Sequence, residues 1–185
     1  IYVKLYLSYN MSIKTIFLDR DGVINKEKEY LYKINDFEFI DGIFEACRHF
    51  VKLDYKIIII TNQSGISRGY YSEDDFHIVT KWMLQQFENN NIKILDVLYC
   101  PHSPSSNCDC RKPKPGMLNV AKNKYSVNME NSWMIGDRER DIRAANLAGI
   151  EKTILVRSGH QINEERSSAM LILDSINQVN QIILK

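Results

Sequence analysis

Long apolar runs are absent from this sequence of 185 residues, and none approaches the roughly 20 residues that a membrane-spanning helix needs. An excess of either charge is also absent, because 24 Lys and Arg residues face 23 Asp and Glu residues for a net charge of +1. Such a balance gives no field that would attract nucleic acid or an anionic membrane. The segment 1–10 lacks the small-residue cleavage pattern of a signal peptide. We therefore expect a cytoplasmic protein with no membrane and no nucleic-acid partner.

Cysteine is scarce, but three of the four cysteines fall within eleven positions. In a chain without a secretory signal, this clustering favours a metal site over disulfides. An apolar content of 44% and a charged content of 25% are ordinary for a globular protein, and the length suits one domain. Met11 directly precedes the first strand-like run, so we expect residues 1–10 to be an N-terminal extension and residues 11–185 to form a single domain. Near-neutral charge and a compact domain are compatible with a monomer.

The stretch Ile16–Asn25 is the most informative part of the sequence. An apolar run over residues 13–18 is typical of a buried parallel strand, and it ends in Asp19 and Asp21, followed by Gly22. Two carboxylates two residues apart in an extended chain point the same way and repel each other unless a cation or a shared proton intervenes. They predict a site for a hard divalent cation, Mg²⁺, and one of them is a candidate nucleophile for aspartyl-phosphate chemistry. A turn after a strand, with no chemistry, is the alternative.

Strand-like runs alternate with helical patterns along the chain. This alternation predicts an α/β fold in which a mostly parallel sheet is covered by helices on both faces. No long insertion follows the first or third strand, so we expect no separate cap domain. The expected strands are Ile13–Leu18, Tyr55–Thr61, Leu95–Tyr99, Ser132–Ile135 and Thr153–Val156. The expected helices run from a cap at Asp41 to about Leu53, from a Ser72–Asp75 capping box onward, and over Gly116–Tyr125, Glu139–Ala148 and Asp174–Leu184.

Polar residues follow further strands, at the edge where open α/β sheets bind ligands. Thr61 begins a polar loop whose hydroxyl and backbone N–H groups suit phosphate oxygens, although an ordinary turn is an equal alternative. Asp137 is a candidate third carboxylate for the cation. Asp141, one helical turn on, either orients a ligand or a metal-bound water, or is a helix-start acid favoured by the helix dipole.

The cysteine cluster contains three thiols and one imidazole, which form a closed tetrahedral ligand set for zinc. The candidate ligands are Cys100, His102, Cys108 and Cys110. With all four positions filled by the protein, no site remains for water, so we expect a structural zinc; a disulfide or four unrelated residues are the alternatives. Because Cys110 directly precedes Arg111 and Lys112, we expect the metal to turn these two cations toward the strand ends, although both could be ordinary solvated residues.

The order of these strand ends resembles the haloacid dehalogenase (HAD) superfamily, with its Rossmann-like fold, across nearly all of residues 11–185. Four segments look like the D-glycero-D-manno-heptose 1,7-bisphosphate 7-phosphatases in particular. They are FLDRDGVIN, TNQSGISRGYY, CPHSPSSNCDCRKPKPGM and IGDRERDI. The related histidinol-phosphate phosphatases share the zinc loop, and the short spacing between His102 and Cys108 suits them equally well.

The resemblance implies a set of roles. Asp19 attacks phosphorus, and Asp21 protonates the leaving oxygen and then activates water, which requires a raised pKa for Asp21. Mg²⁺ is held by the Asp19 side chain, the Asp21 backbone carbonyl and Asp137. Thr61 and Lys112 bind the transferring phosphoryl group, and Arg111 recognises the second phosphate of a small sugar bisphosphate. The residues implied to line the substrate pocket are Glu27, Lys28, Glu29, Tyr30, Asn62, Gln63, Ser64 and Arg138.

Two other functions compete with this one. A histidinol-phosphate phosphatase is the alternative enzyme, and a zinc-stabilised binding module without catalysis is the alternative of a different class. The second predicts a replaced catalytic position, yet all five are present at 19, 21, 61, 112 and 137. One departure from the family is Arg138, where many members have lysine, and its planar fork would bind phosphate or hydroxyl with a different geometry.

Overall fold

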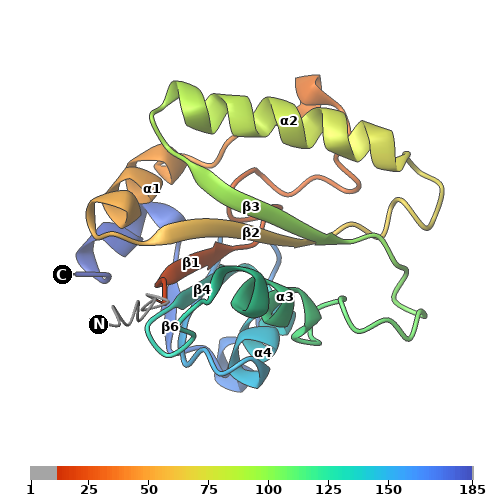
Figure 1. Cartoon of the computed structure of the whole chain (residues 1–185). Coiled ribbons are helices and arrows are strands. Elements are labelled where there is room, and N and C mark those ends of the chain that lie inside the picture. Colours follow the sequence, from red (N-terminus) through yellow and green to blue (C-terminus); the bar gives the residue numbers. More distant parts are fainter. Residues whose placement is uncertain (1–11, 185) are drawn as a thin grey trace, which may run out of the picture.

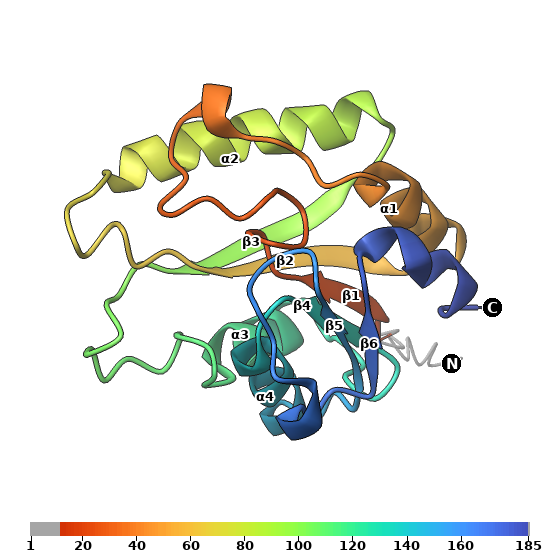
Figure 2. The ribbon, with the colours of Figure 1, turned by 180° about the vertical axis from the view of Figure 1, so that it is seen from behind.

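The computed structural model describes residues 12–184 and contains a six-stranded parallel sheet in the order β3-β2-β1-β4-β5-β6 (Figures 1 and 2). The strands are β1 (Thr15–Leu18), β2 (Lys56–Asn62), β3 (Ile94–Cys100), β4 (Trp133–Gly136), β5 (Lys152–Val156) and β6 (Leu171–Leu173). The predicted α/β fold with a parallel sheet is confirmed. β6 was not expected, because three residues are too short a run to show a strand period.

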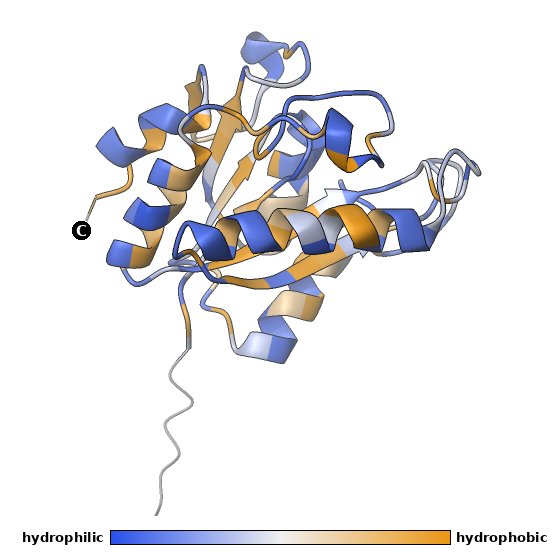
Figure 3. Cartoon of the chain, turned by 90° about the horizontal axis from the view of Figure 1, so that it is seen from above, coloured by the Kyte–Doolittle hydropathy of each residue, from blue (hydrophilic) through white to orange (hydrophobic). Residues whose placement is uncertain are grey.

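Helices cover both faces of the sheet, with α1 and α2 on one side and α3 and α4 on the other (Figure 1). The α-helices are α1 (Ile43–Lys52), α2 (Glu73–Asn89), α3 (Gly116–Tyr125) and α4 (Glu139–Leu147), and the 3-10 helices are η1 (Ile34–Asp36), η2 (Glu164–Arg166) and η3 (Ile176–Gln181). Figure 3 shows largely hydrophobic inner strands and helices that carry both colours, as amphipathic helices do.

The β2 strand shows why the sheet is buried on both faces. Its four consecutive isoleucines are fully buried, and they alternate between two hydrophobic cores. Ile57 and Ile59 pack with α1 and α2, whereas Ile58 and Ile60 pack with α3 and α4. Successive side chains of a strand point to opposite faces, so a continuously apolar run is what a doubly covered strand requires.

The ends of the helices agree only in part with the ends predicted from the sequence. The predicted capping box at α2 is confirmed, since Ser72 and Asp75 exchange side-chain and backbone hydrogen bonds. The predicted cap at Asp41 is wrong: Gly42, with φ of 82°, is the N-cap of α1 and offers no side-chain cap. The predicted final helix over residues 174–184 is only the 3-10 helix η3, in which Ile176 and Val179 pack into the core.

The connections after the strands place the polar loops at one edge of the sheet. Between β1 and α1 the described chain carries only η1, and between β3 and α3 it carries no further helix or strand, so neither segment holds the helices and strands of a separate cap domain. Among residues 12–184, no helix is long and apolar enough to cross a bilayer. The predicted N-terminal extension, residues 1–10, and Met11 lie outside the described residues.

Candidate active site

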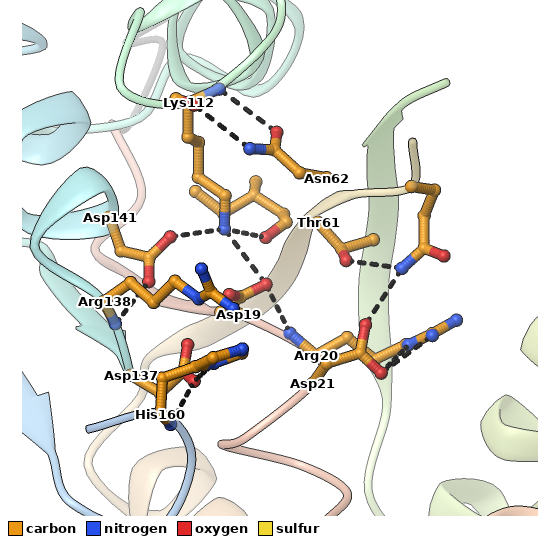
Figure 4. A network of polar contacts seen from close by, with 12 residues as sticks. Asp19, Arg20, Asp21, Thr61, Asn62, Lys112, Asp137, Arg138, Asp141 and His160 are labelled. Atoms are coloured by element: carbon orange, nitrogen blue, oxygen red, sulfur yellow. Dashed lines mark hydrogen bonds and ion pairs between the residues drawn. The ribbon is translucent and has the colours of Figure 1, made fainter. Parts of the chain in front are cut away.

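Asp19 lies at the carboxyl end of β1, at the centre of a buried polar network (Figure 4). Its backbone N–H donates to Ile135 O on β4 (3.0 Å), so the hydrogen bonding of the sheet continues one residue past the strand and fixes the backbone. The carboxylate is only 3% exposed, and its Oδ1 accepts from the Arg20 N–H at 2.8 Å and lies 3.0 Å from Lys112 Nζ. Burial raises the pKa of Asp19, whereas the Lys112 ammonium opposes this rise.

Lys112 points inward and is 2% exposed. Its Nζ lies 3.0 Å from Asp19 Oδ1 and 2.7 Å from Asp141 Oδ1, and it donates to Ile60 O at 2.8 Å. Burial lowers the pKa of Lys112, but the charges of Asp141 and Asp19 outweigh burial and leave the pKa above its ordinary value. The side-chain amide of Asn62 donates to Lys112 O and accepts from Lys112 N, both at 3.1 Å, which holds the lysine backbone against the end of β2.

Asp21 is surrounded by hydrogen-bond donors. Its Oδ1 accepts from the Arg20 guanidinium (2.8 Å) and Asn25 (3.0 Å), and its Oδ2 accepts from Gln63 Nε2 at 3.0 Å. Burial alone would raise the pKa of Asp21, but the Arg20 charge and these hydrogen bonds outweigh burial and lower it. The expectation of a raised pKa for Asp21 is therefore wrong for this structure. The reason is that Arg20 folds back over its neighbour instead of pointing away from it.

Gln63 connects Asp21 to the loop after β2. The same Nε2 group also donates to Thr61 Oγ1 at 2.8 Å, and Tyr71 donates its hydroxyl hydrogen to Gln63 Oε1 at 2.6 Å. The Asp21 carboxylate fixes which end of the amide faces it, because a carboxylate oxygen only accepts and must meet the Nε2 group, which leaves Oε1 to accept from Tyr71.

Asp137 and Asp141, which follow β4, complete the network. Asp137 Oδ2 accepts from the backbone N–H of His160 at 3.0 Å and from its Nδ1 at 2.6 Å, whereas Asp137 Oδ1 is buried with no hydrogen-bond partner. Asp141 Oδ1 pairs with Lys112, and its Oδ2 accepts from Arg138 N at the start of α4 (3.0 Å). Asp141 thus accepts a hydrogen bond at the start of α4, as a helix-start acid does, and it also contacts Lys112; that it orients a ligand or a metal-bound water stays a prediction.

The carboxylates fit a hard divalent cation. One oxygen from each of Asp19, Asp137 and Asp141 lies within 4.8 Å of the others. A buried carboxylate oxygen without a partner is costly unless a cation or a donor meets it, which makes Asp137 Oδ1 the clearest sign of a metal position. Because Asp141 is committed to Lys112 and to the α4 cap, Asp19 and Asp137 are the better candidates for ligands.

The four cysteine and histidine side chains after β3 gather as a metal-ligand set. The Cys100 sulfur lies 3.7 Å from that of Cys108 and 3.1 Å from that of Cys110, and His102 Nδ1 lies 3.5 Å and 3.3 Å from Cys100 and Cys110. Tetrahedral zinc with Zn–S bonds of about 2.3 Å spaces its ligand atoms by about 3.5–3.8 Å. All four cysteines of the chain are free of disulfides.

A cavity of about 320 Å³ opens above Asp21. All nine residues implied to contact substrate line it, from the segments Glu27–Tyr30 and Asn62–Ser64 and from Arg111 and Arg138. Burial, followed by the charge of Asp21, raises the pKa of Glu27 to about 7, so this carboxyl group can donate or accept a hydrogen bond near neutral pH.

Comparisons with known proteins agree with this geometry. A family model described as HAD-hydrolase-like matches residues 109–179. A relative from Campylobacter jejuni, named D-glycero-alpha-D-manno-heptose-1,7-bisphosphate 7-phosphatase, is 51% identical over 84% of this chain and 86% of its own length. The corresponding beta-named enzyme of Vibrio cholerae is 42% identical over 95% and 98%. The chain belongs to the heptose-1,7-bisphosphate 7-phosphatase family. The names of these relatives do not favour the alternative, a histidinol-phosphate phosphatase.

A solved structure extends the likeness to three dimensions. The D,D-heptose 1,7-bisphosphate phosphatase from B. bronchiseptica, complexed with magnesium and phosphate, is 27% identical, with a TM-score of 0.81 over 91% of this chain and 97% of its own. Its magnesium and phosphate agree with the cation and anion chemistry that the carboxylates, Lys112 and the pocket would support here.

Two residues of this site escaped the sequence analysis. Arg140 and His160 both line the cavity. Arg140 belongs to the segment IGDRERDI and lies in the first turn of the predicted helix after Asp137, which could have indicated a position near the site. His160 follows β5, and its place after the carboxyl end of another parallel strand could have identified it as a site residue.

Proposed function

We propose that this chain is a Mg²⁺-dependent phosphatase that removes the C7 phosphate of D-glycero-D-manno-heptose 1,7-bisphosphate, in the synthesis of nucleotide-activated heptose. The observation that carries the proposal is the pairing of a buried nucleophile with an arginine-rich pocket. Four arginines line the cavity without an ion-pair partner among residues 12–184: Arg68, Arg111, Arg138 and Arg140. Guanidinium groups bind phosphate through paired hydrogen bonds, so this pocket suits a substrate with two phosphates.

Arg138 and Arg140 strengthen this argument. The Nε atom of each is buried and has no hydrogen-bond partner. The charge of Arg140 also acts on Asp19, Lys112 and Arg111, so Arg140 lies near both the nucleophile and the cation implied to bind the second phosphate. Guanidinium groups held near one another without a carboxylate in ion-pair contact are unfavourable until an anion joins them.

The chain's own residues divide the reaction into two steps. In the first, an Asp19 oxygen attacks phosphorus, the bond from phosphorus to the C7 oxygen breaks, and that oxygen takes a proton from Asp21. In the second, Asp21 accepts a proton from water as the water oxygen attacks the aspartyl-phosphate, which releases inorganic phosphate and restores Asp19. Thr61 and Lys112 hold the phosphoryl oxygens. The negative charge of the arriving phosphate would raise the pKa of Asp21 toward the value that an acid needs.

Mg²⁺, held by the Asp19 and Asp137 side chains and the Asp21 backbone carbonyl, would neutralise the negative charge between the carboxylate and the phosphate. The orphaned Asp137 Oδ1 supports this ligand set. We further propose a monomeric enzyme of the cytoplasm with one domain over residues 11–185, since this one chain supplies every residue of the site and its cysteines are free.

Steady-state kinetics tests the substrate. We expect kcat/KM for one or both anomers of the heptose bisphosphate to exceed that for histidinol phosphate by at least about 100-fold, since loss of two charge-assisted contacts costs about this much. We expect Arg140→Gln to raise the KM for the bisphosphate about 10-fold while the KM for a heptose monophosphate rises less. Arg143→Gln is the matched control, because Arg143 lies one turn further along α4 and is absent from the cavity lining. A preference for histidinol phosphate would contradict the proposal.

We also propose that the cluster of Cys100, His102, Cys108 and Cys110 holds a structural zinc. Removing it is expected to lower kcat/KM at least about 10-fold while the far-UV circular dichroism changes little, because Arg111 and Lys112 follow the last ligand directly. Metal content and kinetics of chelator-treated protein provide the measurement. Cys108→Ser should lose the zinc, whereas Cys47→Ala should keep it, since Cys47 is a buried core residue of α1. Normal kinetics in verified zinc-free protein would contradict this coupling.

A further inference from the structure

His160, in the loop after β5, contacts a candidate metal ligand with two donors at once. Its backbone N–H and its Nδ1 both reach Asp137 Oδ2, at 3.0 Å and 2.6 Å (Figure 4). Because a carboxylate oxygen only accepts, Nδ1 carries the hydrogen in this contact. Both donors act on the same oxygen, so the other one, the buried Oδ1, is the oxygen left without a partner.

The loop itself is fixed by close packing. Ser158 Oγ donates to Gly22 O at 2.7 Å, which joins the loop after β5 to the loop after β1. A Cβ added to Gly159 would lie 2.1 Å from Asp137 Oδ2, and one added to Gly22 would lie 2.4 Å from the same oxygen. The carboxylate is therefore enclosed between two glycine backbones, and His160 decides which of its two oxygens is hydrogen-bonded within that space.

We infer that His160 is a positioning residue for the metal site, which orients Asp137 so that Oδ1 faces the cation. The inference rests on the proposed function for the identity of that cation, Mg²⁺. Donors that hold a metal-binding carboxylate in place raise the affinity for the metal, since the free carboxylate no longer has to be ordered when the ion binds. The other nitrogen of the His160 imidazole, Nε2, lies 3.8 Å from Glu27 Oε1.

Direct coordination by the imidazole is the competing explanation, because ligand atoms of Glu27, Asp137 and His160 also lie within 4.8 Å of one another. Two observations oppose it. Nδ1 is already bound to Asp137, and Mg²⁺ prefers oxygen ligands over imidazole. An imidazole ligand would favour a softer ion such as Co²⁺ over Mg²⁺, which gives the experiment a way to separate the two explanations.

The test is calorimetric titration of the zinc-loaded full chain with MgCl₂ in the absence of substrate. We expect His160→Ala to weaken Mg²⁺ binding about 10-fold, at the lower end of such effects, since the backbone N–H of residue 160 still donates. His160→Asn places an amide N–H near the position of Nδ1 and should retain most of the affinity, whereas His160→Gln places it near Nε2 and should behave like His160→Ala. His77→Ala is the matched control, because His77 is exposed on α2 and contacts Tyr99.

Kinetics gives a second readout. Saturating Mg²⁺ should restore most of the kcat of His160→Ala and leave the KM for substrate nearly unchanged, because the proposed defect lies in metal binding. Equal Mg²⁺ affinity in wild type and His160→Ala would overturn the inference, as would equal losses in the Asn and Gln variants. A much larger loss for Co²⁺ than for Mg²⁺ would identify the ring as a ligand and also overturn it. Wild-type protein that binds Mg²⁺ but does not hydrolyse heptose bisphosphate would contradict the proposed function alone.

Discussion

Asp19→Asn is expected to lower kcat at least about 10⁴-fold, because an amide can neither attack phosphorus as an anion nor balance the buried Lys112 charge. The substrate should still bind, since the arginines of the pocket are unchanged. Assay of inorganic phosphate release gives the rate, and acid quenching of wild-type enzyme during turnover should trap a phosphorylated peptide containing residue 19. No such peptide should form in the variant.

The matched control for this change is Asp74→Asn, in the first turn of α2, where the carboxylate is exposed. It should change kcat by less than about 2-fold, as surface substitutions away from a site do. If Asp19→Asn retains more than a hundredth of the wild-type rate, or if the trapped phosphate lies on another residue, the assignment of the nucleophile is wrong. An inert wild type with Mg²⁺ and several phosphate esters would favour the non-catalytic binding module.

Lys112→Met should have the largest effect on stability. It leaves the buried carboxylates of Asp19 and Asp141 together without the ammonium that contacts both, and breaking a buried ion pair costs about 3–5 kcal/mol of unfolding free energy. Activity should fall as well, by about 10²–10³-fold in kcat, which is typical for loss of one charge-stabilising group. Urea unfolding and steady-state kinetics give the two measurements.

Two further variants make the stability result specific. Asp141→Asn in the Lys112→Met background should recover part of the lost stability, because it removes one of the two facing carboxylates. Lys124→Met is the surface comparison, since the Lys124–Asp96 pair is largely exposed at the lysine and should contribute less than about 1 kcal/mol. Equal losses of unfolding free energy at Lys112 and Lys124 would show that burial does not determine how much Lys112 contributes to stability.

That the polar side chains after the strands lie close together was predictable, because all strands of a parallel sheet end at the same edge. Asp19, Thr61 and Asp137 each follow an apolar run, and strands that run the same way bring their carboxyl ends to one edge. The family resemblance then supplied roles that spacing alone left open, such as the choice between a phosphate loop and a turn at Thr61.

The features that the sequence did not predict depend on side-chain conformations and on contacts between residues distant in sequence. Arg20 stands between two aspartates, and alternation along an extended chain would point it away, yet it folds back, is buried and lowers the pKa of Asp21. His160 reaches Asp137 across 23 positions of sequence. A hydrogen bond over such a separation leaves no local pattern, because only the packing of the loops after β4 and β5 decides it.

The two glycines that enclose Asp137 limit how this pocket can be redesigned. Gly22 adopts a φ of +86° and faces the same carboxylate oxygen as Gly159, so even a methyl group at either position would collide with the Asp137 side chain. Grafting a new specificity loop after β1 therefore requires the backbone course at residue 22 to be retained. Libraries that diversify this cavity would do better to vary residues 27–30, Ser64 and Arg68, which line it and are not glycines packed against Asp137, and to leave Gly65 unchanged, because a Cβ there would lie 2.1 Å from the Tyr71 ring.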